Sequence, residues 1–68
     1  MAFIIYSETE FDSIYGPIRK GEEINTIMAG PEDEQEIRKF LIKQYVEDGI
    51  SVSYKITETG KKGKILTP

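Results

Sequence analysis

The stretch GPEDEQEIRKFLIKQYVEDGISVSYKIT, residues 30–57, contains the clearest signals for the fold. Its first half predicts a helix over about residues 32–48. Gly30 is suited to the N-cap and Pro31 to the first helical position, and the acidic residues that follow put negative charge at the positive end of the helix dipole. Gly49 can adopt the left-handed conformation that ends a helix. The sequence therefore predicts one helix with both ends marked.

The apolar residues of this helix form one stripe with further apolar residues beside it. The stripe, which must face a core, consists of Ile37, Phe40, Leu41 and Tyr45. At about 100° per residue, Ile42 and Val46 fall outside the stripe. The apolar arc is thus wider than a helix resting on a small sheet needs to bury. We expect either the N-terminal segment or a partner to cover this flank.

Strict alternation of apolar and polar residues follows the helix and predicts a half-buried strand over residues 50–57. Its solvated polar face is typical of an antiparallel sheet with one exposed side. Residues 3–7 are apolar on both faces, as in a central strand, and residues 22–28 indicate another strand. The glycines of residues 58–63 predict a hairpin loop before a short last strand over residues 64–67.

These elements predict a single compact α+β domain. The expected architecture is a three- or four-stranded, mostly antiparallel sheet with one amphipathic helix packed on one face, in the order β-β-α-β-β. Residues 11–18 give conflicting signals, because Phe11, Ile14, Tyr15 and Ile18 have helical spacing whereas Gly16-Pro17 interrupts any helix. We expect a single turn there, followed by an extended stretch.

Composition restricts the chemistry that this chain can perform. Among its 68 residues there is no cysteine and no histidine, which removes disulfides, thiolate nucleophiles, imidazole acid–base chemistry and the usual zinc ligands. The acidic run Glu32-Asp33-Glu34 is best interpreted as capping charge on the first helical turn rather than as a metal site. We therefore expect no enzyme activity, no metal and no cofactor.

The N-terminal apolar run is too short for a signal peptide or a membrane span, and no basic residue precedes it. We therefore expect a cytoplasmic protein that does not bind membranes.

Lysines are concentrated in the C-terminal hairpin, at Lys55, Lys61, Lys62 and Lys64, and could bind nucleic acid. Gly60-Lys61-Lys62-Gly63-Lys64 is similar to the glycine-plus-basic KOW motif of ribosome- and polymerase-associated domains over these few residues only, so we name no family. A net charge of −3 disfavours a general nucleic-acid binder, and lysines on an edge strand also discourage aggregation. Nucleic-acid binding therefore stays an alternative.

By elimination, we expect a small non-enzymatic module that binds a protein target. An exposed apolar patch would serve this role, and the partner-binding candidates are Phe11, Ile14, Tyr15, Ile18, Ile42 and Val46. In size, acidity and lack of chemistry the chain is similar in kind to the phage- and mobile-element-encoded proteins that inhibit or modulate a host protein. A homodimeric structural or regulatory module that uses the same apolar flank remains a further alternative.

Overall fold

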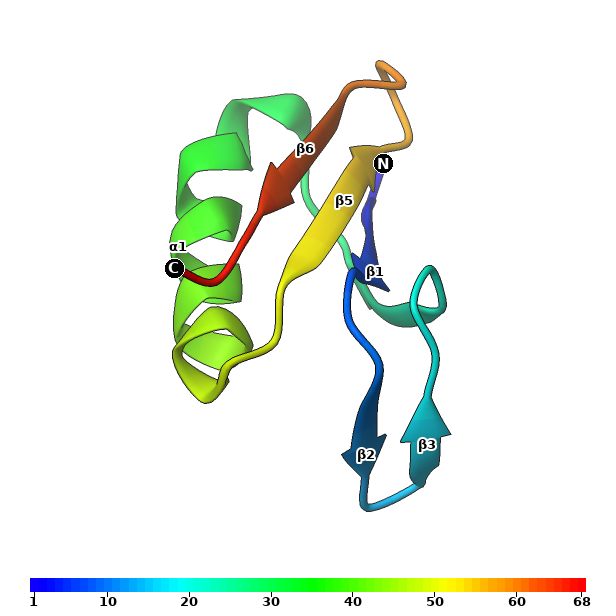
Figure 1. Ribbon diagram of the computed structural model, residues 1–68. Helices are drawn as coiled ribbons and strands as arrows, with labels where there is room; N and C mark the ends of the chain where they lie inside the picture. The colour runs from blue at the N-terminus through cyan, green and yellow to red at the C-terminus, as the bar shows by residue number, and fades with distance from the viewer.

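The computed structural model describes residues 1–68 and shows one helix packed on one face of a four-stranded antiparallel sheet (Figure 1). The sheet has the order β4-β1-β5-β6, built from β1 (Phe3–Ser7), β4 (Glu23–Ile27), β5 (Val52–Ile56) and β6 (Lys62–Ile65). The helix α1 (Glu34–Gln44) is flanked by the single-turn 3₁₀ helices η1 (Pro31–Asp33) and η2 (Val46–Asp48). Two further short strands, β2 (Phe11–Ser13) and β3 (Gly16–Ile18), pair only with each other. The predicted α+β class is confirmed, with two additional strands before the helix.

The central position of β1 explains why its sequence is apolar on both faces. It pairs antiparallel with β4 on one side and with β5 on the other. Phe3 and Ile5 point toward α1 and are fully buried, whereas Ile4 and Tyr6 alternate to the opposite side and are half-buried. Because β1 lies between them, β4 and β5 run in the same direction without being neighbours.

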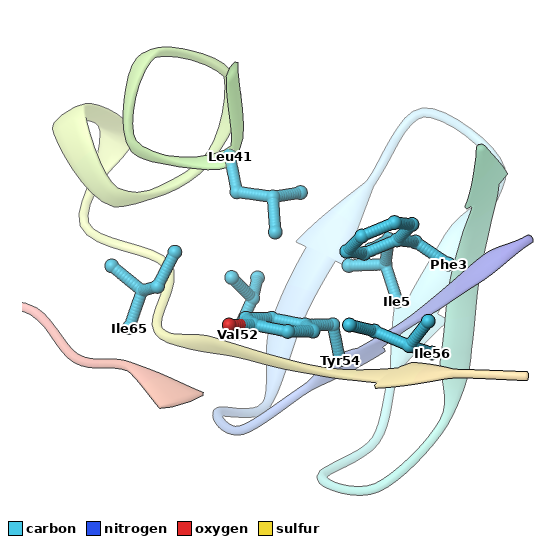
Figure 2. Packing of buried hydrophobic residues seen from close by; sticks show 7 residues of the cluster. All are labelled: Phe3, Ile5, Leu41, Val52, Tyr54, Ile56 and Ile65. Carbon is cyan, nitrogen blue, oxygen red and sulfur yellow. The ribbon is translucent and has the colours of Figure 1, made fainter. Parts of the chain in front are cut away.

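The core lies between the sheet and α1 (Figure 2). Its buried members come from the helix and from the inner faces of three strands, β1, β5 and β6, and they are Phe3, Ile5, Leu41, Val52, Tyr54, Ile56 and Ile65. The partly buried Ile24 and Ile27 of β4 pack against them. Leu41 is the only fully buried residue of α1. The prediction that Phe40 faces the core is wrong, because the helix centres Leu41 on the sheet and turns Phe40 about 100° away. Phe40 is 44% exposed.

Both helix ends follow the predicted chemistry, but the α-helix is shorter than expected. Gly30 is the N-cap of η1, where its N–H donates to the Asp33 carboxylate at 3.4 Å, and Gly49 has the left-handed φ of +84°. The α conformation ends at Gln44 because Tyr45 adopts φ −125° and ψ −52°. The chain then continues as η2, which turns Val46 toward the core.

Candidate functional site

Residues 8–22, here called the arm, are inserted between β1 and β4 and include β2 and β3. Figure 1 shows the arm projecting beyond the end of the sheet, away from α1. Backbone hydrogen bonds hold its base. The Ser7 N–H donates to the Glu22 carbonyl at 2.9 Å, and the Gly21 N–H donates to the Ser7 carbonyl at 2.7 Å. The Glu8 N–H donates to the Ser51 carbonyl at 2.8 Å, which extends the β1–β5 pairing into the arm.

The arm is a β-hairpin, so the prediction of one turn followed by an extended stretch is wrong. Phe11 pairs with Ile18, and Ser13 pairs with Gly16 across the ribbon. The helical spacing of the apolar residues was misleading, because the two outer ones are cross-strand partners. Pro17 is tolerated because a two-stranded ribbon leaves backbone groups on both outer edges without a ladder partner.

A two-residue turn at Ile14 and Tyr15, here called the tip, closes the hairpin. The Tyr15 N–H donates to the Ser13 hydroxyl oxygen at 3.1 Å, and that hydroxyl donates to the Gly16 carbonyl at 2.8 Å. Neither tip residue has a positive φ, whereas Gly16 has φ +116°. Serine at the first and glycine at the fourth position are the preferences of a type I turn. The Ser13 side chain therefore fixes the backbone that presents the tip.

The two tip side chains are the most exposed large apolar residues of the chain. Ile14 and Tyr15 are each 92% exposed, compared with 78% for Met28. Below them on the ribbon, Phe11 and Ile18 are half-buried. Two apolar side chains held out on a defined turn can enter a pocket of another molecule with little further ordering of the backbone.

The other predicted partner-binding residues do not join this surface. Ile42 is 40% exposed on α1, and Val46 is half-buried against the core in η2. The exposed Phe40 lies about 200° around the helix from Ile42, so these two side chains are on opposite flanks of α1. The structure thus separates the helix candidates from the arm candidates and leaves the tip as the most prominent apolar feature.

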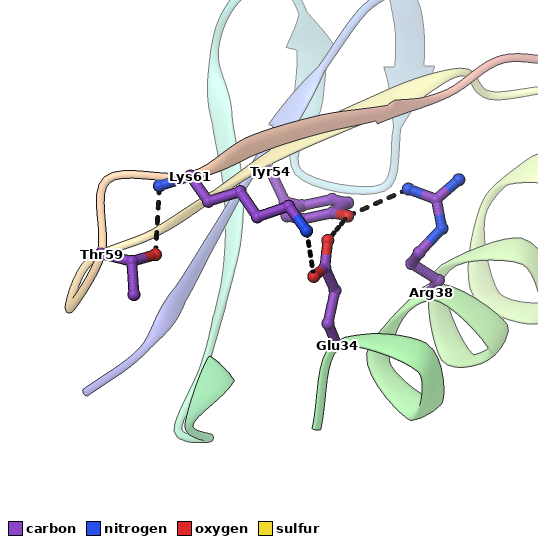
Figure 3. Close-up of polar contacts among 5 residues, drawn as sticks. All are labelled: Glu34, Arg38, Tyr54, Thr59 and Lys61. Atoms are coloured by element: carbon purple, nitrogen blue, oxygen red, sulfur yellow. Dashed lines mark hydrogen bonds and ion pairs between the residues drawn. The ribbon is translucent and has the colours of Figure 1, made fainter. Parts of the chain in front are cut away.

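The structure divides the lysines of the C-terminal hairpin between two sides of the sheet. Lys61 reaches the side occupied by α1, where its ammonium donates to Glu34 at 2.8 Å (Figure 3). Glu34 also accepts from the Tyr54 hydroxyl, which in turn accepts from Arg38 at 2.9 Å. This cluster connects the start of α1 to β5 and β6, so Lys61 has a structural partner.

Hydrogen bonding and burial shift three pKa values in this cluster. The hydrogen bonds from Lys61 and then from Tyr54 lower the pKa of Glu34 below its usual value. Burial, followed by the hydrogen bond to Glu34, raises the pKa of Tyr54. The hydrogen bond to Glu34 raises the pKa of Lys61. All three shifts favour a charged Glu34, a neutral Tyr54 and a charged Lys61 at neutral pH. These are the protonation states in which the hydrogen bonds of the cluster form.

Lys55, Lys62 and Lys64 instead lie on the side of the sheet opposite α1, here called the open face. Sequence reasoning missed Tyr6 and Ser53, which belong to the same face and line one hollow with these lysines. Part of the signal was available from the sequence, because side chains alternate along a strand, but the β1–β5 register was not. Alternation puts Lys61 and Lys62 on opposite sides and, once β1 and β5 are paired, puts Tyr6 beside Ser53.

The remaining acidic residues do not gather into a cation site. No group of three or more acidic side chains has a geometry that could hold a metal ion. Within the acidic run, Asp33 accepts from the Gly30 N–H and Glu34 accepts from Lys61. No helix of the chain combines the length and the apolar character needed to cross a membrane.

Comparisons with protein-family models, with curated proteins and with solved structures find no match to this chain. The geometry of the arm and of the sheet is therefore the evidence on which a function can be argued.

Proposed function

We propose that this chain is a small protein-binding module whose arm inserts Ile14 and Tyr15 into an apolar pocket of a partner protein. The single observation that supports the proposal most is the 92% exposure of both tip side chains on a turn fixed by Ser13. Isoleucine and tyrosine left in water forgo about 1.5–3 kcal/mol each that burial would provide. A preorganised turn lets binding recover this free energy with little loss of backbone entropy.

Charge near the tip indicates what surrounds the pocket. Asp12, the charged residue closest to the tip in sequence, is exposed on β2, whereas Glu10 precedes that strand on the side of the arm's base. The basic residues Arg19 and Lys20 lie toward the base of the arm. The Asp12 carboxylate beside the tip repels phosphates and complements a pocket with a basic rim. We therefore propose a protein partner for the arm, which the module modulates or inhibits by occupying the pocket.

Affinity capture with matched variants tests this proposal. The immobilised wild-type chain should retain one stoichiometric protein from a lysate of the producing cell. The double variant Ile14→Ser/Tyr15→Ser should lose that protein, because buried anchors at an interface centre contribute about 2 kcal/mol or more each. The control is Met28→Ser, which removes another exposed apolar side chain outside the arm and should retain the protein.

Calorimetry with the purified partner then measures the effect of preorganisation. Ser13→Ala removes both side-chain hydrogen bonds of the turn and keeps the tip residues. We expect binding to weaken about 3- to 10-fold, in line with the modest net value of such hydrogen bonds. Equal binding by the wild type and by the tip double variant would refute the arm as the docking element.

Self-association through the tip is the second outcome that these variants can distinguish. If the partner is another copy of the chain, the sedimentation coefficient should rise with concentration for the wild type and stay constant for the tip double variant. Ile42→Asp is the matched variant for the helix flank. Val46→Asp is unsuitable for this purpose, because Val46 packs against the core and its substitution would also destabilise the fold.

A further inference from the structure

The open face of the four-stranded sheet presents a group of side chains that lie outside the core. α1 packs on the other side of the sheet (Figures 1 and 2), and alternation along β1, β5 and β6 directs Tyr6, Ser53, Lys55, Lys62 and Lys64 away from it. Together with Tyr54 and Gly63, these residues line a hollow of about 300 Å³. This volume lies at the lower end of the range for ligand sites and suits one nucleotide-sized group rather than a larger molecule.

Two lysines on this face are in an unfavourable arrangement. Lys55 and Lys62 are direct cross-strand neighbours, and like charges in that position destabilise a sheet. Neither has an acidic side chain within 4.0 Å, since the ion pairs of the chain involve Lys39, Lys61 and Lys64. Lysines on the edge strand β6 would be enough to discourage edge-to-edge association. That explanation does not require a lysine opposite them on the inner strand β5.

Charged side chains are distributed unevenly over the open face, and their positions indicate where an anion would bind. Lys64 is two residues from Lys62 on β6, about 6.6 Å along the strand, and its ammonium is 3.3 Å from Glu8. Tyr6 pairs with Ser53 of β5 on one side and with Glu23 of β4 on the other. Positive charge is thus confined to the β5–β6 half of the face, with Tyr6 at its boundary.

We propose that the open face binds a single strand of nucleic acid, with phosphates held by Lys55, Lys62 and Lys64 and one base stacked on Tyr6. An aromatic ring beside a row of lysines on a sheet is the combination that sequence-tolerant single-strand binders use. An acidic peptide would satisfy the lysines but would leave the ring without a specific role. This surface is distinct from the tip, so the inference goes beyond the proposed function.

Fluorescence anisotropy with a labelled 12-nucleotide thymidine strand tests the inference on the full chain. Binding is expected at 20 mM KCl and should weaken with salt with a log–log slope of about −2, which corresponds to about three phosphate contacts. Lys55→Gln/Lys62→Gln should reduce the affinity at least 10-fold. The control Lys39→Gln/Lys43→Gln makes the same charge change on α1 and should alter the affinity less than 2-fold.

Two further variants separate specific binding from general attraction. Tyr6→Leu keeps an apolar side chain and should reduce the affinity about 5-fold or more while leaving the salt slope unchanged. Glu8→Gln frees Lys64 from its ion pair and should raise the affinity about 2- to 5-fold.

Circular dichroism should show the same thermal midpoint or a higher one for Lys55→Gln/Lys62→Gln, because the repulsion across β5 and β6 is removed.

Several results would overturn the inference. Absence of binding at 20 mM KCl would do so directly. An equal loss of affinity in the helix control would show that only net charge matters. Competition by polyglutamate as effective as competition by unlabelled thymidine strand, or no effect of Tyr6→Leu, would identify the face as a site for acidic protein segments instead.

Discussion

Tyr54 and Tyr15 are the same side chain in opposite settings. Tyr54, on β5, is 1% exposed beneath α1, and its hydroxyl donates to Glu34 and accepts from Arg38. Tyr15, at the tip of the arm, is 92% exposed. The body of the protein, meaning the four-stranded sheet and α1, buries Tyr54 to fold, whereas the arm exposes Tyr15. Stability and binding should therefore respond to different substitutions.

The largest effect is expected at the buried tyrosine. Tyr54→Ala removes the largest fully buried side chain of the core. Aromatic-to-alanine changes in cores cost about 3–5 kcal/mol, which is comparable with the roughly 3–10 kcal/mol of total stability for a chain of this length. We expect the variant to be largely unfolded by far-ultraviolet circular dichroism at 25 °C.

A matched variant separates the contribution of the Tyr54 ring to stability from that of its hydroxyl. Tyr54→Phe keeps the packing and leaves Glu34 and Arg38 without this partner. It should lower the free energy of unfolding by about 1–3 kcal/mol in urea denaturation. A loss as large as that of Tyr54→Ala would show that the polar cluster, and not ring packing, dominates at this position.

The next largest loss of stability is expected at Gly63 on the edge strand β6, where Tyr54 leaves no space for a side chain. A Cβ at Gly63 would overlap the end of the Tyr54 ring, including its hydroxyl oxygen. Gly63→Ala should therefore lower the free energy of unfolding by about 1–3 kcal/mol, as overpacking usually does. Lys62→Ala is the control on the same strand and should stay within about 0.5 kcal/mol. Equal stability of the two variants would mean that Tyr54 moves aside freely.

A smaller effect concerns the acid dependence of stability. Because the pKa of Glu34 is lowered in the folded protein, its carboxylate stabilises the fold above the unfolded value of about 4.3, and this contribution is lost as the pH falls through the folded pKa. Glu34→Gln should remove it, so that the urea midpoint falls less between pH 5 and pH 3 than in the wild type. Glu36→Gln, an exposed carboxylate one half-turn away, should keep the wild-type dependence. An unchanged pH profile in Glu34→Gln would contradict the assignment.

The body could be predicted from the sequence because its patterns are long and mutually consistent. The alternation of residues 50–57 and the apolar run of residues 3–7 each predict a strand beside a single helix, whereas the order of the strands in the sheet was left open. Gly30 and Gly49 mark the outer ends of the 3₁₀ turns η1 and η2 that flank α1, whereas the α-helix itself is shorter than predicted. Phe40 was misassigned because a stripe defined by spacing alone does not say which of its members faces the centre of the sheet.

The arm could not be predicted because its pattern is short and fits two periods. Over eight residues, Phe11 and Ile18 are compatible with helical spacing and also with cross-strand pairing. Its turn chemistry, Ser13 followed three residues later by Gly16, was the informative signal. The open face was missed for a different reason, since the group of Tyr6 with Ser53 depends on the register between β1 and β5.

The smallest effect on stability, and the sharpest test of the comparison, is expected for Tyr15→Ala. The substitution is the same as at Tyr54, but the side chain is almost wholly in water, and the Ser13 hydrogen bond is made by the Tyr15 backbone, which the change retains. The free energy of unfolding in urea should therefore change by less than about 0.5 kcal/mol. The same variant should bind the arm's partner at least about 10-fold more weakly, since an exposed aromatic anchor is the type of residue that dominates interfaces. A loss of stability above 1 kcal/mol would show that the tip packs onto the body in solution, and Tyr15 would then contribute to folding as well as to the binding that we propose for it.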